Sequence, residues 1–254
     1  MGILKRAISA DASVVAMAVD TTDIVSEIEK IHKTSAVTTA ALGRLTTAAS
    51  MIGYSLKNKD DSVTLRLDGK GPSGALIAVS DYMGNVKSYI QNPVVEIPLN
   101  KHGKLDVAGA VGTDGTLSVI KDIGLKEPYS GMIPLVSGEI AEDVAAYFAT
   151  SEQVPTVCGL GVLVNPDLSV NCAGGYLVQL LPFASDAVID QIEKNVNSLK
   201  SMTQMMTDGI TMEELDSMME ENEKKGKETE VQCHFCNKIY KFSNADLQKL
   251  KKQM

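Results

Sequence analysis

Strand-like and helix-like patterns of hydrophobic positions are mixed over the first part of the chain. Residues 63–67 alternate apolar and polar side chains, which is typical of a half-buried strand. In residues 35–56 the apolar side chains recur at three- and four-residue intervals, which predicts a helix. Residues 138–151 predict another helix, with Ser137 as its N-cap and with acidic residues that suit the positive end of the helix dipole.

Two hairpins are also predicted. Residues 74–80 and 86–90 form the arms of the first, and residues 156–164 and 168–172 form the arms of the second. Hairpins imply antiparallel pairing, which favours an α+β fold or a mixed sandwich over a doubly wound parallel sheet. Further strand patterns lie at 12–19 and 117–120.

The second hairpin carries two cysteines, and its register decides whether they meet. If its turn is centred near Asn165, Cys158 and Cys172 lie opposite each other, at a Cβ separation of about 4.5–5.5 Å that permits a disulfide. The alternative is that both thiols are buried as small hydrophobic side chains, which a reducing compartment favours.

The pattern changes twice along the chain, which predicts three parts. Residues 1–184 form a core domain, residues 185–228 a helical, methionine-rich linker that becomes increasingly charged, and residues 229–254 a short tail around a cysteine pair. The expected architecture is therefore an α+β core of sheets and helices, a helical linker and a small C-terminal knuckle of the zinc-ribbon type.

Charge and hydropathy narrow the classes of function. The net charge of −8 disfavours nucleic-acid binding, which needs a positive field against phosphates. No run of about eighteen apolar residues is present, and the N-terminal residues lack the continuous apolar stretch of a secretory signal. We therefore expect a cytoplasmic protein whose thiols are reduced, metal-bound or regulatory.

The tail contains a Cys-x-x-Cys motif, Cys233-His234-Phe235-Cys236. Two thiolates at this spacing can hold one metal ion from a tight turn, and residues 230–232 and 239–242 predict strands on either side of it. A structural zinc takes four ligands, however, and neither the linker nor the tail has a second cysteine pair. Zinc ligation, thiol redox chemistry and an inert turn all remain open on spacing alone. Residues 244–252 predict a closing helix.

Half of the twelve methionines cluster between residues 202 and 219, in the middle of the linker. Methionine is flexible and polarisable and is common on surfaces that bind varied partners, so these residues are candidates for client binding. They could equally pack a helix against the core, and a helix that is packed at rest and can detach reconciles the two interpretations. The residues are Met202, Met205, Met206, Met212, Met218 and Met219.

No catalytic constellation is predicted. Residues 69–74 are rich in glycine but lack the Gly-Lys-Ser/Thr ending of a phosphate loop, so a turn between strands is expected. His32 has no nucleophile and acidic partner that would suggest a triad, and we expect a packed or surface histidine. Glu139, Glu142 and Asp143 could hold a metal, but a helix N-terminus explains them equally well.

Many short motifs, in order, give the chain a resemblance to the redox-regulated heat-shock chaperones of thirty-three kilodaltons found in bacteria. The tail motif around Cys233 and Cys236, followed by Tyr240 and Phe242, matches the C-terminal half of that family's zinc site. The other matching segments include His32-Lys33-Thr34, Ala41-Leu42-Gly43-Arg44, Gly69-Lys70-Gly71-Pro72-Ser73-Gly74, Tyr129-Ser130-Gly131, Ser151-Glu152-Gln153 and Ala173-Gly174-Gly175-Tyr176.

The resemblance implies an activity and its regulation. In the family, a CxC pair and a CxxC pair bind zinc, oxidation turns them into disulfides and releases the metal, and the linker then unfolds. The protein dimerises and holds unfolding or oxidatively damaged clients without ATP. Here the CxC pair is absent, so only Cys233 and Cys236 carry over as zinc ligands and as redox-active thiols, and the switch is expected to be incomplete. A thiol–disulfide oxidoreductase and a nucleic-acid-binding zinc ribbon are the competing classes.

Overall fold

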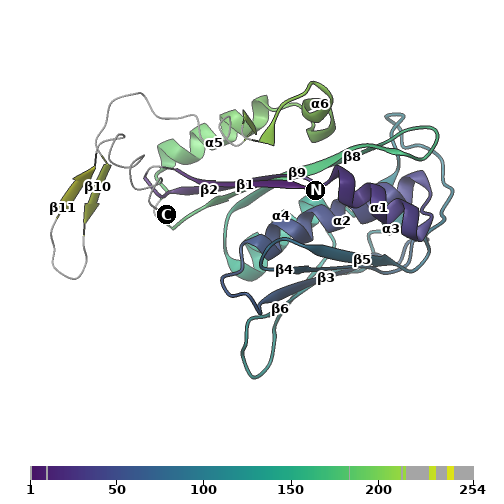
Figure 1. Ribbon diagram of the computed structural model, residues 1–254, viewed down its shortest axis with the longest axis horizontal. Helices are drawn as coiled ribbons and strands as arrows, with labels where there is room; N and C mark the ends of the chain where they lie inside the picture. Colours follow the sequence, from purple (N-terminus) through teal and green to yellow (C-terminus); the bar gives the residue numbers. More distant parts are fainter. Residues whose placement is uncertain are drawn as a thin grey trace.

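The computed structural model describes residues 2–9, 11–182, 184–212 and 214–215, together with the backbone of residues 229–232 and 239–242. Two antiparallel sheets face each other with helices between them, and further helices cover the outer side of one sheet (Figure 1). This arrangement confirms the predicted α+β class with antiparallel pairing.

The first sheet has four strands in the order β1-β2-β9-β8. It joins the N-terminal strands to the second predicted hairpin, because β2 pairs with β9 over its whole length. The strands are β1 (Ile3–Ile8), β2 (Val14–Asp20), β8 (Thr156–Val164) and β9 (Val170–Leu180).

The second sheet has five strands in the order β5-β4-β3-β6-β7. In its central strand Val63, Leu65 and Leu67 are buried while Arg66 is exposed, so the predicted alternation is confirmed. The first predicted hairpin forms the β4–β5 edge. The strands are β3 (Ser62–Asp68), β4 (Leu76–Asp81), β5 (Val86–Ile90), β6 (Thr116–Asp122) and β7 (Tyr129–Pro134).

The central helix α2 (Ala36–Tyr54) lies between the two sheets (Figure 1). It is buried on all sides from Val37 to Gly53 apart from Arg44, as expected of a helix with apolar or small residues all round. Its small residues permit close approach, since a Cβ on Gly43 would lie 2.8 Å from Val25 and 2.9 Å from Val162. The other helices are α1 (Thr22–His32), α3 (Val107–Val111), α4 (Ala141–Tyr147), the π-helix η1 (Phe148–Glu152), α5 (Asp186–Ser198) and α6 (Met202–Thr207).

The helix predicted at 138–151 begins later than expected, and Ser137 is not its N-cap. α4 starts at Ala141, and the side chain of Asp143 accepts hydrogen bonds from the backbone N–H groups of Val136, Ser137 and Ile140 at 2.7–3.0 Å. The Ser137 hydroxyl instead accepts from the N–H of Glu139. A buried carboxylate therefore accepts from the N–H of Ile140, which a Ser137 cap could have bound, and from two N–H groups of the preceding loop.

Of the two alternatives for Cys158 and Cys172, the register that would place them opposite each other is not found. β8 pairs Cys158 with Leu177 and Leu163 with Cys172, because the turn extends to Ser169 and the ladder is irregular beyond Leu163. Since side chains alternate between the faces of a sheet, the two thiols lie on opposite faces. Both are free cysteines, as the alternative interpretation predicted.

In the tail, β10 (Thr229–Gln232) and β11 (Ile239–Phe242) pair antiparallel, which confirms the two predicted strands. The predicted helix at 244–252 lies outside the described residues.

Candidate functional site on the outer face of the four-stranded sheet

The linker helices α5 and α6 cover the face of the four-stranded sheet that points away from α2 (Figure 1). A second hydrophobic cluster forms there, separate from the main core between the sheets. Its buried members are Val14, Ala16, Ala18, Tyr176 and Val178 from the strands, and Ile192, Met202, Met205, Met212 and Leu215 from the linker.

Two paired glycines provide a flat surface for α6. Gly161 of β8 lies opposite Gly174 of β9. A Cβ on Gly161 would come within 3.0 Å of the Met202 Cβ, and one on Gly174 would come within 2.9 Å of the Met206 sulfur. The absence of side chains at these positions lets the helix lie directly on the sheet.

The candidate methionines differ in burial. Met202 and Met205 are 3% and 1% exposed, and Met212 is 7% exposed. Met206 is partly buried against the same cluster. Met218 and Met219 lie outside the described residues. The described methionines therefore pack against the sheet, as the structural interpretation of the cluster predicted.

Few side chains hold the linker to the sheet. Of the thirteen residues of α5, all described, Ile192 alone is buried. Most of its polar contacts are local: Ser201 accepts from the N–H of Gln204 at the start of α6, and Lys200 pairs with Asp208 at 2.6 Å on the surface. The Cys172 thiol of β9 adds a weak contact with α6. Because exposed ion pairs contribute at most about 1 kcal/mol, the attachment of the linker depends on its apolar anchors.

Cys172 lies under α6, with its sulfur 3.9 Å from the carbonyl oxygen of Thr203. Burial raises its pKa, and a hydrogen bond with Thr207 partly offsets the effect. On the other face of the sheet, burial raises the pKa of Cys158 to about 12. Both thiols are therefore protonated and weakly nucleophilic near neutral pH.

The predicted zinc ligands Cys233 and Cys236 lie outside the described residues. The flanking residues Gln232 and Ile239 are paired across the β10–β11 ladder. Within the described part of the chain, no group of three or more His, Cys, Asp and Glu side chains could hold a metal ion.

The remaining sequence candidates have structural roles. Residues 69–74 connect β3 to β4, so the predicted turn is confirmed. The Arg44 guanidinium donates to the Glu139 carboxylate at 2.5 Å, which ties α2 to the segment before α4. His32 shares a hydrogen bond of 3.0 Å with the carbonyl oxygen of Ser88 and packs edge-on against Tyr89. The interpretation of His32 as a packed histidine is confirmed.

A protein-family model described as Hsp33 protein matches residues 3–224. The chain belongs to the Hsp33 family.

Relatives from the family support this assignment over their full lengths. A protein of Clostridioides difficile named 33 kDa chaperonin is 42% identical, with 98% of each chain covered. A protein of the same name from Agathobacter rectalis is 41% identical, with 97% of this chain and 98% of the relative covered. The crystal structure of the Hsp33 homologue of Thermotoga maritima has a TM-score of 0.81 and 33% identity, covering 98% of this chain and 97% of its own.

Membership of the Hsp33 family confirms the resemblance and the prediction of a chaperone family rather than an enzyme family. The alignment with the 33 kDa chaperonin of Bacillus licheniformis runs over 290 positions and covers all of both chains, whereas this chain has 254 residues. That relative therefore has residues that this chain lacks. Within the described residues, no helix is long and apolar enough to cross a membrane.

One cluster in this member of the Hsp33 family was not predicted. Lys121 of β6 pairs with Glu152 of η1, and the Tyr147 hydroxyl donates to the same carboxylate at 2.8 Å. Burial, and then the bond to Glu152, raise the pKa of Tyr147 well above its usual value. Lys121 and Glu152 are 31 residues apart, so no local pattern links them, although Glu152 lies in a segment that carried the family resemblance.

Proposed function

We propose that this member of the Hsp33 family is an ATP-independent holdase chaperone that binds unfolding or oxidatively damaged proteins. One observation carries the proposal: an apolar, methionine-bearing linker packs through few anchors on an apolar sheet face. Relatives in the family are named chaperonins, and such a segment can supply apolar surface for client binding once it detaches from the sheet. Met202, Met205, Met206, Met212, Met218 and Met219 are the proposed client-binding residues.

The energetics favour a linker that can detach. The linker orders the residues of α5 and α6 and those that follow, with five buried apolar side chains. Because so few apolar anchors hold so many ordered residues, a modest perturbation should release both the methionines and the sheet face.

We further propose that the zinc-dependent switch is incomplete. Cys233 and Cys236 supply two thiols on a segment flanked by paired strands, which suits one half of a zinc site. Bound zinc would hold both thiols as thiolates and add folding free energy to the tail. The other two cysteines cannot complete the set without rearrangement, because Cys158 faces the main core and Cys172 lies under α6. The longer alignment with a relative supports the loss of an internal segment.

The proposed organisation keeps three parts: a chaperone core at 1–184, a linker at 185–228 and a truncated switch at 229–254. We place the protein in the cytoplasm and propose that its active form is a homodimer. The β10–β11 pairing supports a zinc-type knuckle over a thiol oxidoreductase, because a thioredoxin-like motif follows a strand and opens a helix.

The test is suppression of aggregation. The full chain is added without ATP to a thermally unfolding client, once under reducing and once under oxidising conditions, and light scattering is followed. Because half of the switch is missing, we expect suppression already in the reduced state and little gain on oxidation. A Cys233→Ser/Cys236→Ser variant should show the same suppression in both conditions, because its tail has no thiol left to oxidise. Absence of suppression by the unaltered chain in both states would refute the holdase assignment.

A further inference from the structure

A pocket of about 470 Å³ lies between the two sheets, beside the segment that follows α2. Its volume is in the range of about 300–1,000 Å³ that is usual for small-molecule sites. Strands β1, β2 and β9 supply one wall, while β6, η1 and the segment after α2 supply the others. Apolar side chains form part of the lining, and these are Val15, Met17, Leu56, Ile123 and Leu181.

The β1–β2 ladder places a cation beside this apolar surface. Arg6 pairs with Met17, and directly paired residues of antiparallel strands extend from the same face of a sheet. Met17 belongs to the main core between the sheets, so Arg6 also lies on the inner face of the four-stranded sheet. Lys57 lines the same pocket from the segment that follows α2. Two cations from distant parts of the chain therefore meet at one pocket.

Both carboxylates of the lining are already bound by neighbouring groups. Asp61 is buried and accepts from the backbone and side-chain amides of Asn58 at 3.0–3.2 Å. Glu152 pairs with Lys121 and accepts from the Tyr147 hydroxyl. Neither carboxylate is therefore available to neutralise the other cations of the pocket.

Arg6 and Lys57 are the cations that remain available. Among the described residues, no side-chain hydrogen bond or ion pair holds either of them, and both are exposed. The chain as a whole carries a net charge of −8, so this pocket differs in charge from the rest of the molecule. Its free positive groups favour an anionic ligand over a cationic one.

A π-helix positions one residue of the lining. η1 ends at Glu152, and the next residue, Gln153, has a left-handed φ of 57°. The Glu152 carboxylate reaches Lys121 on β6, so η1 and the five-stranded sheet are joined at the pocket. π-helices are rare and frequently lie at functional sites. η1 therefore marks this pocket by a feature that is independent of its charge.

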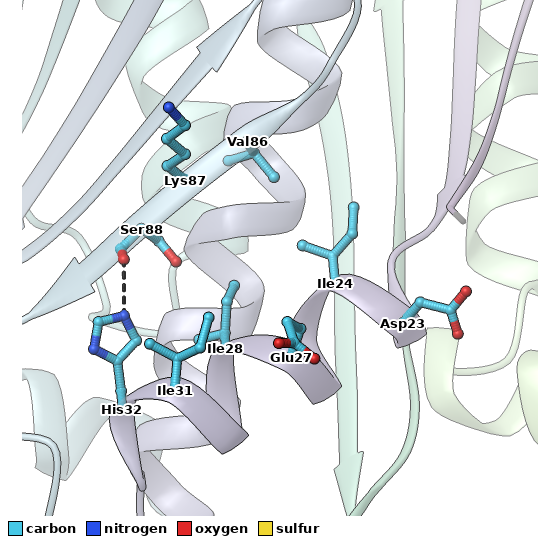
Figure 2. A pocket seen from close by; sticks show the side chains of 9 residues that line it. All are labelled: Asp23, Ile24, Glu27, Ile28, Ile31, His32, Val86, Lys87 and Ser88. Carbon is cyan, nitrogen blue, oxygen red and sulfur yellow. Dashed lines mark hydrogen bonds between the residues drawn. The ribbon is translucent and has the colours of Figure 1, made fainter.

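The groove between α1 and β5 has a different character (Figure 2). Glu27 lies in its lining with a side chain that is 65% exposed. The side chain of Lys87 extends away from α1 (Figure 2). An anionic ligand is therefore expected in the pocket between the sheets and not in this groove.

We propose that the pocket between the sheets binds a small amphipathic anion, a molecule with one carboxylate or phosphate group on an apolar body. Arg6 and Lys57 bind the anionic group, because a guanidinium can donate two parallel hydrogen bonds to either kind of anion and an ammonium adds a second charge. The apolar side chains of the lining contact the body of the ligand. This site lies apart from the linker, and its ligand binding does not depend on the holdase function.

The first experiment is isothermal titration calorimetry of the full chain at low salt. The probes are decanoate, decyl phosphate and decylamine, which share one alkyl chain, each below the concentration at which it forms micelles. At least one of the two anions should bind about tenfold more tightly than decylamine, and added salt should weaken its binding. The tighter anion identifies the anionic group that the pocket prefers.

Decylamine is a stringent comparison because the chain is acidic. Non-specific attraction to a chain of net charge −8 would favour the cationic probe. Decylamine that binds as tightly as both anions, or anions that do not bind, would overturn the proposal.

Matched variants locate the site. Lys57→Gln removes a cation of the lining, and Lys59→Gln makes the same change at an exposed lysine outside it. Lys57→Gln should weaken binding of the tighter anion about fivefold, whereas Lys59→Gln should change it less than about twofold. Ile123→Asn and Leu125→Asn make a second pair, since both side chains are exposed and Ile123 lines the pocket while Leu125 does not. Equal effects within either pair would place binding elsewhere and overturn the proposal.

The outcome is separable from that of the holdase proposal. If the unaltered chain suppresses aggregation but binds neither anion, the pocket proposal fails and the holdase function remains. If an anion binds in a manner that depends on Lys57 and the chain suppresses no aggregation, the holdase proposal fails while the pocket is confirmed as an anion site.

Discussion

At the scale of single residues, Asp143 organises the turn that precedes α4. Its side chain is fully buried and accepts from the N–H groups of Val136, Ser137 and Ile140. A buried N–H without a partner costs about 1–3 kcal/mol, so removal of this carboxylate leaves several such costs uncompensated.

We therefore expect Asp143→Ala to lower the free energy of unfolding by about 2–4 kcal/mol, measured by urea denaturation. Glu142→Ala is the matched control, since Glu142 is adjacent but exposed, and it should cost less than about 1 kcal/mol. Equal losses in the two variants would mean that the helix dipole, and not the hydrogen bonds, makes this carboxylate important.

The sequence pattern correctly predicted an acidic helix N-terminus here, but the predicted N-cap, Ser137, is wrong. The motif Ser137-Gly138-Glu139 fits a cap locally, and only the folded chain shows that Asp143 turns back to the preceding loop. In the same way, the register in which Cys158 would face Cys172 is not found, because the β8–β9 turn is longer than its local sequence indicates and Cys172 lies opposite Leu163. A local sequence pattern predicts the helix or strand that holds a residue. Strand register and long-range contacts determine which other residue it contacts.

At the scale of elements, α2 and α6 show that the sequence predicts a helix more readily than it predicts what packs around that helix. Helical spacing predicted α2, but not that sheets would cover it on two sides. The methionine cluster predicted a helix that packs at rest, and the burial of Met202 and Met205 agrees with it. The sequence did not predict that α6 packs on Gly161 and Gly174, because the two glycines lie opposite each other only through the β8–β9 register.

This glycine pair allows a test of linker detachment that leaves the methionines intact. Gly161→Val would place a side chain where the Cβ of Met202 lies, 3.0 Å from the added Cβ, and should lift α6 from the sheet. In a Cys233→Ser/Cys236→Ser background, Cys172 should then react with a maleimide about tenfold faster at pH 8, because it lies under α6. The same substitution should increase aggregation suppression.

Cys158 is the internal control for this experiment. It faces the main core, and burial raises its pKa to about 12, so its labelling should stay slow in both proteins. Faster labelling of both cysteines would indicate general unfolding. Faster labelling of Cys172 without a gain in aggregation suppression would contradict the role proposed for the linker.

At the scale of the whole molecule, the chain joins its described core to a tail that carries Cys233 and Cys236, for which a switch function is proposed. A structural zinc takes four ligands, and each chain supplies Cys233 and Cys236 outside the core. Two chains together supply four thiolates.

We therefore expect about one zinc per two chains in protein purified under reducing conditions. A chelator should convert the zinc-bound dimer to monomer in analytical ultracentrifugation. Cys233→Ser should abolish both the metal and the dimer, while Cys172→Ser should leave the zinc content unchanged. One zinc per monomeric chain would mean that other side chains of the same chain complete the site. Zinc-free protein that still suppresses aggregation would mean that the holdase works without the switch, and that its regulation does not depend on these two cysteines.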